Sequence, residues 1–582
     1  MRAILSFVAA SIFVVASEGA LAQHRTPPER GSGWTGKQIV TSKRFMVAAA
    51  HPLAVDVGYR ILRQGGTAVD AAIAVQLVLN LVEPQSSGIG GGAFMLHHDG
   101  KRNRLVAYDG RETAPAAAKP DRFLDTDGKP LEFYDAVIGG RSVGVPGTLA
   151  LLAEAHRRHG RLPWAKLFEP AIAIAERGFA VSPRLYALLA GETDLTQPRV
   201  HTYFYNADGS PRAVGSVLRN PAFAATLRKI AAGGARVFYT GDIARDIVDT
   251  ANSHLASPGD LTLADLAGYR VVAREAVCDS YRAYRVCGMP LPSSGGLGVL
   301  QMLEMLQPYD LRSMGAASFW SVHFISEAGR LAYADRDVYM ADPAFYTPPT
   351  GLLNHEYLAQ RSQLIRVDAS MGKAQAGTPP APAAMQKVAY GQHAALEFAS
   401  TSHISIVDRY DNAVAMTTTI EYGFGSRLMT ESGFLLNNEL TDFSFLPSNA
   451  GKPVANQVEG GKRPRSSMAP TIVYDRAGRV FMVAGSPGSS AIINYVVKTL
   501  IAVIDWDMDP QAAIELPNFG SRNGPTELEI DTPVAALAPK LQALGHMTRA
   551  SEQPSGVQAI VRTRTGWAGG ADPRREGAVR GD

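Results

Sequence analysis

Cysteine is almost absent from this chain, and other features that would assign it to a class are scarce. Two cysteines in 582 residues are too few for a disulfide-rich scaffold. The net charge is only +3 and no run of basic residues occurs, so nucleic-acid binding has no support. No apolar run after the first residues is long enough to span a membrane. What remains is a chain that is 46% hydrophobic, enough for a large core or two closely packed lobes.

The first 22 residues are typical of a removable export signal. Arg2 gives a positive start, and the apolar stretch from Ile4 to Ala16 is too short for a transmembrane helix. Ala20 to Ala22 is a small-x-small cleavage site. We therefore expect residues 1–22 to be a signal peptide and the mature protein to begin at Gln23, in the periplasm or outside the cell.

The two cysteines flank a predicted two-residue turn at Arg282-Ala283. Counting outward from this turn places Cys278 opposite Cys287 at a non-hydrogen-bonded position, where side chains approach most closely. An oxidising compartment favours a disulfide between them. Two unpaired buried cysteines fit the sequence equally well, so both alternatives stay open.

A strand pattern opens at Thr401, and the strand expected beside it closes at Thr419. Apolar residues alternate after Thr401, residues 408–412 have turn chemistry, and residues 413–419 return as a strand. A hairpin centred on Tyr410 places Thr401 opposite Thr419, with Cβ atoms about 4.5–5.5 Å apart, so the hydroxyls can hydrogen-bond. Most such pairs are surface contacts without chemistry. The rest of the chain must therefore decide whether Thr401 is a nucleophile.

Helical and strand patterns alternate elsewhere. We predict helices over residues 52–63, 68–82, 146–158, 164–177, 319–334 and 491–504, and strands over 471–474, 480–484 and 558–561. Residues 377–384 are rich in proline and alanine and should be weakly structured. Gly88 to Ala93 superficially matches a dinucleotide-binding fingerprint. A helix precedes it and a strand follows it, whereas the fingerprint requires the reverse, so we reject that interpretation.

Four other segments carry groups suited to a nucleophile that acts on a carbonyl of an amino-acid substrate. Arg111 suits a bidentate carboxylate contact, and Ser466-Ser467 can donate hydrogen bonds to the same group. The backbone N–H groups of residues 485–490 can hold an oxyanion, and residues 437–442 offer acceptors for an ammonium group. Taken singly, each has a simpler meaning: a surface salt bridge, a polar turn, a helix cap and a self-capping loop.

Taken together, these segments resemble the gamma-glutamyltranspeptidase family from about Val40 to Asp572. The motifs occur in the family's order: Asp70-Ala71-Ala72, Ser87 to Phe94, Arg111 to Pro115, Val145-Pro146-Gly147, Pro292 to Gly296, Tyr333 to Arg336, Thr401-Ser402-His403, Leu435 to Phe443, Lys462 to Met468, Gly485 to Gly488 and Ala571 to Arg574.

The resemblance implies an N-terminal-nucleophile hydrolase, an α+β fold in which two stacked sheets lie between helical layers as an αββα sandwich. Family members are made as one precursor and cut before the threonine that matches Thr401. This implies a helix-rich large fragment, residues 23–400 ending at Ser400, and a small fragment, residues 401–582. The two fragments are expected to stay together as a non-covalent heterodimer.

The resemblance also implies a chemistry. Thr401 attacks the gamma-amide carbonyl of glutathione or a related compound, and its own α-amine serves as the base. Water, an amino acid or a dipeptide then takes the gamma-glutamyl group. No cofactor and no metal are implied.

Each site residue matches a family motif. Thr419 supports the Thr401 hydroxyl, and the amides of Gly488 and Ser489 form the oxyanion hole. The glutamyl α-carboxylate is assigned to Arg111, Ser466 and Ser467. The α-amino group is assigned to Glu421, Glu439 and Asp442. His403 has no role that can be argued.

Three departures from the family pattern bear on these roles. Ser489 stands where many members have a second glycine, and its oxyanion role holds unless the local torsions require a positive φ. Glu421 replaces an asparagine found in some members, although others carry glutamate. The loop from Ser444 to Gly461 is shorter than in family members whose loop forms a long lid over the site, and it lacks a tyrosine. The sequence therefore does not decide how far this loop covers the site, or how hydrolysis is balanced against transfer.

Two alternatives remain. One is a glutaryl or cephalosporin acylase of the same fold, and the other is a non-enzymatic binding protein for gamma-glutamyl compounds. The presence of three acids for one head group favours a substrate that carries an amino group.

Overall fold

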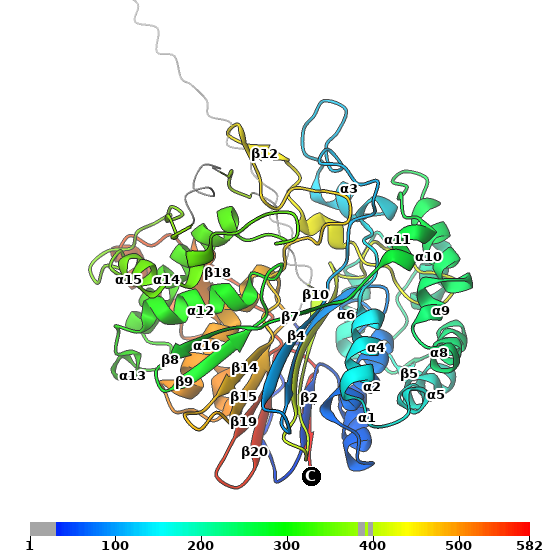
Figure 1. Ribbon diagram of the computed structural model, residues 1–582, viewed down its shortest axis with the longest axis horizontal. Helices are drawn as coiled ribbons and strands as arrows, with labels where there is room; N and C mark the ends of the chain where they lie inside the picture. The colour runs from blue at the N-terminus through cyan, green and yellow to red at the C-terminus, as the bar shows by residue number, and fades with distance from the viewer. Residues whose placement is uncertain (1–30, 382–389, 394–399) are drawn as a thin grey trace, which may run out of the picture.

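Two seven-stranded sheets stack face to face in the computed structural model, which describes residues 31–381, 390–393 and 400–582 (Figure 1). The predicted signal peptide and part of the proline-rich stretch lie outside the described residues. We call the sheet that holds Thr401, the predicted nucleophile, the nucleophile sheet. Its order is β21 (Ala578–Gly581), β2 (Met46–Ala49), β10 (Ser400–Val407), β11 (Ala413–Glu421), β3 (Gly92–Asp99), β4 (Arg104–Gly110) and β7 (Val272–Arg274).

The second sheet is likewise antiparallel throughout. Its order is β1 (Val40–Ser42), β20 (Trp567–Ala571), β19 (Gln558–Arg562), β15 (Val480–Gly485), β14 (Thr471–Tyr474), β9 (Tyr284–Gly288) and β8 (Val277–Tyr281). A small separate sheet contains β16 (Phe519–Ser521), β17 (Thr526–Glu529) and β18 (Thr548–Ser551).

Helices cover the outer face of each sheet, which confirms the expected four-layer arrangement (Figure 1). The layer over the nucleophile sheet includes α1 (Pro52–Arg63), α2 (Ala68–Val82), α4 (Thr148–His159), α5 (Glu169–Arg177) and α8 (Pro221–Gly233). The layer over the second sheet includes α12 (Gly295–Leu306), α14 (Phe319–Tyr339) and α16 (Ile492–Ile504).

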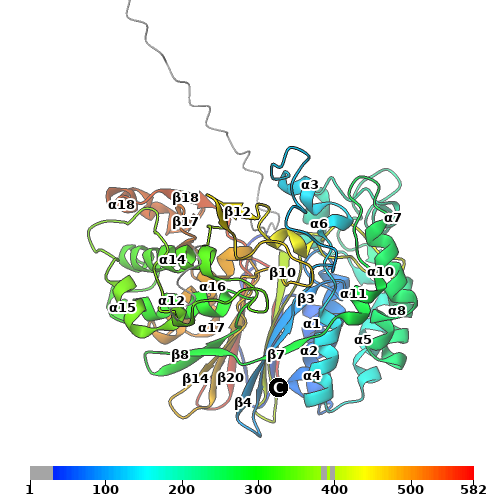
Figure 2. The same cartoon turned by 45° about the horizontal axis from the view of Figure 1, so that its top comes forward.

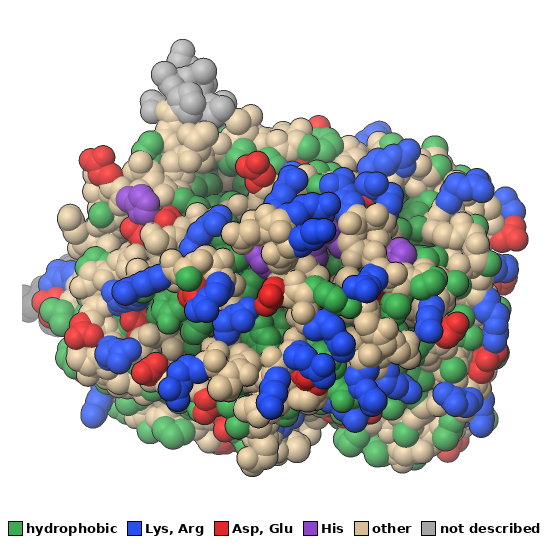
Figure 3. Space-filling view, turned by 60° about the horizontal axis from the view of Figure 1, so that its bottom comes forward, with side chains coloured by type: hydrophobic (Ala, Val, Ile, Leu, Met, Phe, Trp, Pro, Cys, Tyr) green, Lys and Arg blue, Asp and Glu red, His purple; other side chains and the backbone are tan. Residues whose placement is uncertain are grey.

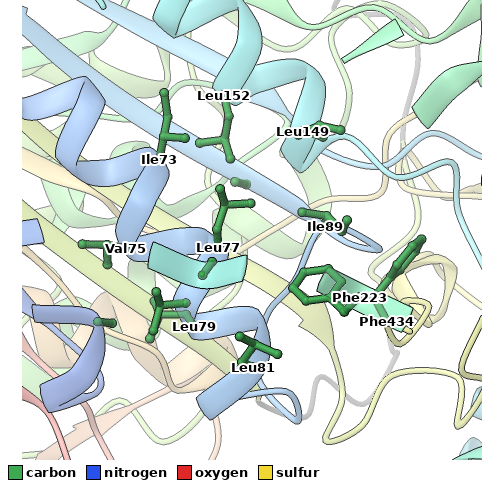
Figure 4. Packing of buried hydrophobic residues seen from close by; sticks show 14 of the residues in the cluster. Ile73, Val75, Leu77, Leu79, Leu81, Ile89, Leu149, Leu152, Phe223 and Phe434 are labelled. Carbon is green, nitrogen blue, oxygen red and sulfur yellow. The ribbon is translucent and has the colours of Figure 1, made fainter. Parts of the chain in front are cut away.

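The helix α2 lies at the centre of one hydrophobic core. Every residue from Ala68 to Val82 is buried, because the helix packs on the sheet and is itself covered by outer helices. Figure 4 shows Leu77 and Leu79 of this helix in the same cluster as Phe223 and Phe434. Each fully buried aliphatic side chain stabilises the fold by about 1.5–3 kcal/mol. This core fixes the outer face of the nucleophile sheet.

The strand β10 is buried on both faces, because one face packs on the helical layer and the other on the second sheet. Ile404 and Ile406 belong to the core on the α2 side. His403 and Ser405 point the other way, toward the second sheet, where the Ser405 hydroxyl donates to the carbonyl of Gln558 at 3.0 Å. Thr401 shares their parity along the strand and therefore faces the space between the two sheets.

The predicted element boundaries hold best where local signals are strong. The helices 52–63 and 68–82 and the strand 471–474 are confirmed without change. The single helix expected over 164–177 is wrong: a 3₁₀ turn, Trp164–Leu167, precedes α5. Pro170 explains the break, because proline has no N–H and is tolerated only in the first turn of a helix. The helix α14 extends five residues beyond the predicted end at Ala334, to Tyr339.

The cysteine alternatives are resolved in favour of a disulfide. Cys278 and Cys287 are cross-strand partners of β8 and β9, as the turn count predicted. Their Cα atoms are 4.1 Å apart and their sulfur atoms are bonded. The bond joins two neighbouring strands at the edge of the second sheet. Within the described residues, no helix combines the length and the apolar character that crossing a membrane would need.

Candidate active site

The β10–β11 hairpin has the predicted register, with Thr401 opposite Thr419. The register shifts at the preceding residue, where Ser400 pairs with Glu421 and leaves Ile420 as an extra residue in β11. Such a bulge bends the strand and re-aims its side chains. Glu421 also has a positive φ of 74°, a conformation that few non-glycine residues adopt. The backbone is therefore irregular at the peptide bond that precedes Thr401.

A chain of hydroxyl groups links Thr401 to that peptide bond. The Thr401 hydroxyl donates to Thr419 Oγ1 over a long 3.5 Å, and Thr419 Oγ1 donates to the carbonyl of Ser400 at 2.7 Å. The amide of Glu421 donates to Thr419 Oγ1 at 2.8 Å and holds it in place. Thr419 therefore contacts the Thr401 hydroxyl and polarises the carbonyl group of Ser400 at once.

Contacts from distant segments fix the same backbone. Arg575 Nη1 donates to the carbonyl of Thr401 at 3.4 Å, and the Ser400 hydroxyl donates to the carbonyl of Gln85 at 2.6 Å. Ser87 donates to the Ser402 hydroxyl at 3.4 Å. The glycine-rich motif that begins at Ser87 matches the family, but no role for Ser87 was predicted from it. These contacts hold Thr401 on a rigid strand.

A narrow cavity brings the predicted site residues together. All six predicted substrate-binding residues line it with Thr401, Thr419 and Ser489. The full lining is Arg111, Thr401, Thr419, Glu421, Glu439, Asp442, Ser466, Ser467, Met468, Ser489 and Ile492. Gly488 is not among the lining residues but directly precedes Ser489.

Arg111 is the only cation among the described residues that line this cavity, and its guanidinium contacts two acids and two backbone carbonyl groups. It forms ion pairs with Glu439 and Asp442. It also donates from Nε to the carbonyl of Pro464 at 3.1 Å and from Nη2 to the carbonyl of Arg465 at 2.8 Å. Burial opposes the charge, but the two acids outweigh burial and raise the pKa of Arg111 above its usual range. Arg111 is thus fixed and permanently charged.

Acidic groups outnumber Arg111 in its surroundings. Burial raises the pKa of Glu112 to about 7. Burial, Asp442 and Glu439 together raise the pKa of Glu421 well above its usual range, and burial does the same for Glu439. Burial and the neighbouring carboxylates thus favour the protonated form of part of this cluster. Glu112 also belongs to this acidic cluster and was not predicted from the sequence, although it lies within the family motif Arg111 to Pro115.

The two serines are held by an arginine that sequence reasoning also missed. Arg336 Nη2 donates to the Ser467 hydroxyl at 2.6 Å, and its Nε donates to the Ser294 hydroxyl at 2.9 Å. Ser294 in turn donates to the carbonyl of Ser466 at 2.7 Å. The motifs around Ser294 and Arg336 carried the resemblance, so the signal was present without an assigned function.

The turn before α16 has left-handed backbone torsions. Gly488 has a φ of 133° and Ser489 a φ of 57°. The local backbone at Ser489 is therefore of the kind that favours glycine, the condition under which its oxyanion role came into question. A left-handed torsion costs a non-glycine residue roughly 1–2 kcal/mol. The serine retains its backbone N–H at that cost.

His403 makes its hydrogen bonds away from Thr401. Its Nδ1 contacts the Thr417 hydroxyl at 2.8 Å and its Nε2 contacts the Ser405 hydroxyl at 3.1 Å. Burial lowers the pKa of His403 to about 3, so the imidazole is neutral. These contacts fit its omission from the predicted site.

The short loop from Ser444 to Gly461 stands next to the cavity. It carries the two-residue strands β12 (Ser448–Asn449) and β13 (Lys452–Pro453), which Figure 2 shows with α3 (Phe133–Val137) near the start of β10. Asn456 donates from its side chain to the carbonyl of Asp442 at 2.7 Å and accepts from the amide of Arg465 at 3.0 Å. The base of the loop is thus tied to two segments that contact Arg111.

Two groups of side chains in the described residues have spacings that suit a metal ion, and neither lines the Thr401 cavity. His355, Asp279 and Glu304 lie at the surface. His323, Glu327 and His546 are buried. In the buried group His323 contacts His546 at 2.7 Å, and Arg330 donates to Glu327 at 2.8 Å. That guanidinium already neutralises the carboxylate and opposes a second cation.

Comparison with known proteins agrees with this geometry. A family profile described as Gamma-glutamyltranspeptidase matches residues 54–581. The chain is 36% identical over 568 residues to the "Glutathione hydrolase proenzyme" of Bacillus subtilis, covering 96% of this chain and 95% of that protein. It is 34% identical over 545 residues to the "Acylase ACY 1 proenzyme" of a Pseudomonas species, covering 92% and 93%.

Solved structures show the same fold. A cephalosporin acylase from Bacillus halodurans superposes with a TM-score of 0.81 at 27% identity, covering 94% of this chain and 97% of that one. The gamma-glutamyltranspeptidase of Helicobacter pylori gives a TM-score of 0.54 at 33% identity, covering 61% and 99%. The fold is thus that of the N-terminal-nucleophile hydrolases expected from the sequence.

Proposed function

The chain belongs to the gamma-glutamyltranspeptidase family, and from this premise we propose that it is an exported gamma-glutamyltransferase and glutathione hydrolase that uses Thr401 as its nucleophile. One observation carries the proposal: a single cavity is lined by the Thr401–Thr419 pair, by Arg111 and the two serines, and by three acids. This combination suits a substrate with a carboxylate, an ammonium group and a carbonyl to be attacked.

The proposed first step is cleavage before Thr401. The Thr401 oxygen attacks the carbonyl carbon of Ser400, the peptide C–N bond breaks, and the hydroxyl proton passes to the leaving nitrogen. Water then hydrolyses the resulting ester, which leaves a carboxylate on Ser400 and restores the Thr401 hydroxyl beside a free amine. Support comes from the hydrogen bond between Thr419 and the Ser400 carbonyl and from the irregular backbone there. Both relatives described above are named proenzymes.

The same hydroxyl then attacks the substrate. In our proposal, Arg111, Ser466 and Ser467 hold the α-carboxylate of the gamma-glutamyl group. The acids Glu421, Glu439 and Asp442 receive its ammonium group. Because these acids surround one arginine and compete for it, an incoming cation relieves their mutual repulsion.

The acyl transfer follows from this placement. The free amine of Thr401 takes the proton of its own hydroxyl as the oxygen attacks the gamma-carbonyl. The amides of Gly488 and Ser489 stabilise the developing oxyanion, a contribution that is usually worth about 3–4 kcal/mol. The protonated amine then passes its proton to the leaving nitrogen, and a gamma-glutamyl ester of Thr401 remains. Water or the amine of an amino acid or dipeptide takes the acyl group.

An acylase that removes glutaryl or cephalosporin side chains is the second candidate. It is favoured by the name of the Pseudomonas relative and by the structural match to a cephalosporin acylase. A glutaryl group has no ammonium, whereas Glu421, Glu439 and Asp442 together line the cavity and suit a cationic group. These three acids therefore favour the gamma-glutamyl substrate.

A direct assay separates the two candidates. Purified protein is incubated with glutathione and with the analogue that lacks the glutamyl amine, and release of cysteinylglycine is measured for each. We expect turnover of glutathione at least tenfold faster, because loss of a charge-assisted contact costs about 1.5–3 kcal/mol. Preference for the analogue would establish the acylase, and no turnover of either by cleaved protein would remove both.

Export and assembly are tested on the same preparation. We propose that the mature fragments run from Gln23 to Ser400 and from Thr401 to Asp582. Both cysteines lie before Ser400, so no disulfide can join the fragments. N-terminal sequencing of the two bands should give Gln23 and Thr401, and both bands should co-elute on gel filtration.

A further inference from the structure

The end of the sheets opposite Thr401 is a broad basic face. The turns of four hairpins meet there: 100–103, 408–412, 475–479 and 563–566. The amide of Gly100 donates to the side chain of Asn412 at 3.0 Å, and Arg562 lies 3.5 Å from Asp411, so hairpins of both sheets are neighbours. The eight-residue strand β10 separates these turns from Thr401 by about 25 Å.

Two helix ends extend this face. Arg161, just after α4, lies over the ring of Tyr410 at 4.8 Å, and the Tyr410 hydroxyl donates to the carbonyl of Gly65 after α1 at 3.1 Å. The edge of the second sheet adds Arg285, which pairs with Tyr474 beside the 475–479 turn.

The side chains at this end are predominantly cationic, as Figure 3 shows by the excess of blue over red. Seventeen arginines and lysines belong to it, and all but Arg562 are exposed. They are Lys43, Arg44, Arg60, Arg63, Lys101, Arg102, Arg104, Arg157, Arg158, Arg161, Arg285, Arg409, Arg476, Arg479, Arg562, Arg564 and Arg580. We call this set the basic face.

Acidic side chains at the same end are fewer. There are nine: Asp56, Asp70, Asp99, Glu154, Asp408, Asp411, Asp475, Asp507 and Asp582. The basic face therefore has eight more cations than carboxylates, while the whole chain has a surplus of only three. All other residues together thus carry five more carboxylates than cations. The charge of the molecule is separated along the strands.

Part of this positive charge is not neutralised by the protein. Lys43, Lys101, Arg104, Arg476 and Arg564 are exposed, and none of them has an ion-pair partner among the described residues. The large hydrophobic side chains that are exposed in the described chain lie outside the four turns. Attraction at this face is therefore electrostatic, without an apolar group to insert.

We propose that the basic face docks on an anionic lipid bilayer and holds the Thr401 cavity on the side away from the membrane. Charge complementarity is the argument, because clustered arginines and lysines attract anionic headgroups within about a Debye length of the surface. The cations spread over both sheets and two helix ends, which suits a flat bilayer better than a single narrow polymer. Binding of this kind is peripheral, reversible and sensitive to salt.

Vesicle sedimentation tests the proposal. The full chain is mixed with vesicles of phosphatidylcholine alone or of phosphatidylcholine with phosphatidylglycerol, at low and at high salt. We expect it to sediment only with the anionic vesicles and to be released by salt. The variant Lys101→Glu/Arg104→Glu/Arg476→Glu/Arg564→Glu should bind at least tenfold more weakly, with unchanged turnover of soluble substrate.

A matched control separates the face from net charge. The variant Lys119→Glu/Lys129→Glu/Lys373→Glu/Lys540→Glu makes the same charge change at exposed lysines elsewhere. It should retain most vesicle binding. Equal loss in the two variants, or no sedimentation of the parent chain with anionic vesicles at low salt, would overturn the proposal. Retention on a heparin column without vesicle binding would instead show that the partner is a soluble polyanion, which also overturns it.

Discussion

The Thr401 hairpin and the Arg111 cluster meet in one cavity but are built in opposite ways. The hairpin brings together residues 18 positions apart through strand pairing, and its contacts are between hydroxyls and backbone. The cluster joins segments more than 300 positions apart through buried charges. Strand pairing therefore sets the register of Thr401, whereas long-range packing assembles the charged cluster around Arg111. Cleavage and substrate binding should be separable by mutation.

The largest effect is expected at Thr401, because we propose that this one residue serves both chain cleavage and attack on the substrate. Thr401→Ala should give an uncut, inactive chain with a retained fold, because only a hydroxyl and a methyl group are lost. Thr401→Ser should still be cut, but more slowly, since serine lacks the β-branch that restricts χ1. Thr419→Ala should be milder than Thr401→Ala. Denaturing gels over days, with glutathione assays at each time, measure both steps; normal cleavage of Thr401→Ala would refute the nucleophile assignment.

Arg111→Ala should separate the two regions most clearly. We expect kcat/KM for glutathione to fall, with a loss of about 2–4 kcal/mol of transition-state stabilisation, while cleavage before Thr401 continues. Lysine should not restore the rate, because one ammonium cannot replace a guanidinium fork. Removal of Arg111 also removes the ion pairs that it forms with Glu439 and Asp442. Thermal unfolding of the cleaved protein is therefore the control, and unchanged kinetics would exclude Arg111 from the site.

Asp442→Asn sharpens the comparison within the cluster. The variant loses a charge that should face the substrate ammonium, so we expect kcat/KM for glutathione to fall about tenfold or more. The rate with the analogue that lacks the amine should change little. Parallel kinetics on the two substrates check this, and equal losses would show that Asp442 does not read the ammonium group.

Glu112 makes the cluster sensitive to pH. Its folded pKa of about 7 lies above the usual value, so the folded chain holds a proton that the unfolded chain releases. Stability from this group is therefore lost as pH rises from about 4.5 to about 7. Glu112→Gln should be more stable than the parent at pH 8, by roughly 1–3 kcal/mol, and similar at pH 4. Denaturant unfolding at both pH values tests this. An equal difference in the free energy of unfolding between variant and parent at pH 4 and pH 8 would contradict it.

The smallest effect is expected at Ser489, in the turn that lines the cavity with Thr401. Ser489→Gly relieves a left-handed torsion but adds freedom to the unfolded chain, so the gain in stability should not exceed about 1 kcal/mol. Activity should be kept because the backbone N–H is unchanged. Ser489→Val is the matched test, since a β-branched residue at positive φ should lower both stability and turnover. A fully active and stable Ser489→Val would show that the torsion is unimportant.

The same contrast explains what the sequence could predict. The register of Thr401 with Thr419, and of Cys278 with Cys287, follows from alternation and turn position, which are local signals. The helices α1 and α2 were also placed correctly by their periodicity and end signals. The resemblance supplied the site residues, and the cavity gathers all of the predicted catalytic and substrate-binding residues except Gly488.

Features that depend on packing were beyond the sequence. The sequence assigned Arg111 to a substrate carboxylate but gave no sign that its guanidinium pairs with Glu439 and Asp442. The raised pKa of Glu112 comes from burial, which a motif does not reveal. The role of Arg336 in holding Ser467 depends on the approach of α14 to a distant turn.

The order of strands in the nucleophile sheet has a consequence for the stability of the two fragments after cleavage. Strands from before and after Thr401 interleave, since β2 lies between β21 and β10, and β11 pairs with β3. Cutting the chain at Thr401 would thus produce two polypeptides that have no independent folded form, because both contribute strands to one shared sheet and neither holds all of its neighbouring strands. Separation of the fragments and denaturation would be one event. If the two halves were expressed from separate genes, they would have to fold together by complementation, because neither half would be a folded subunit beforehand.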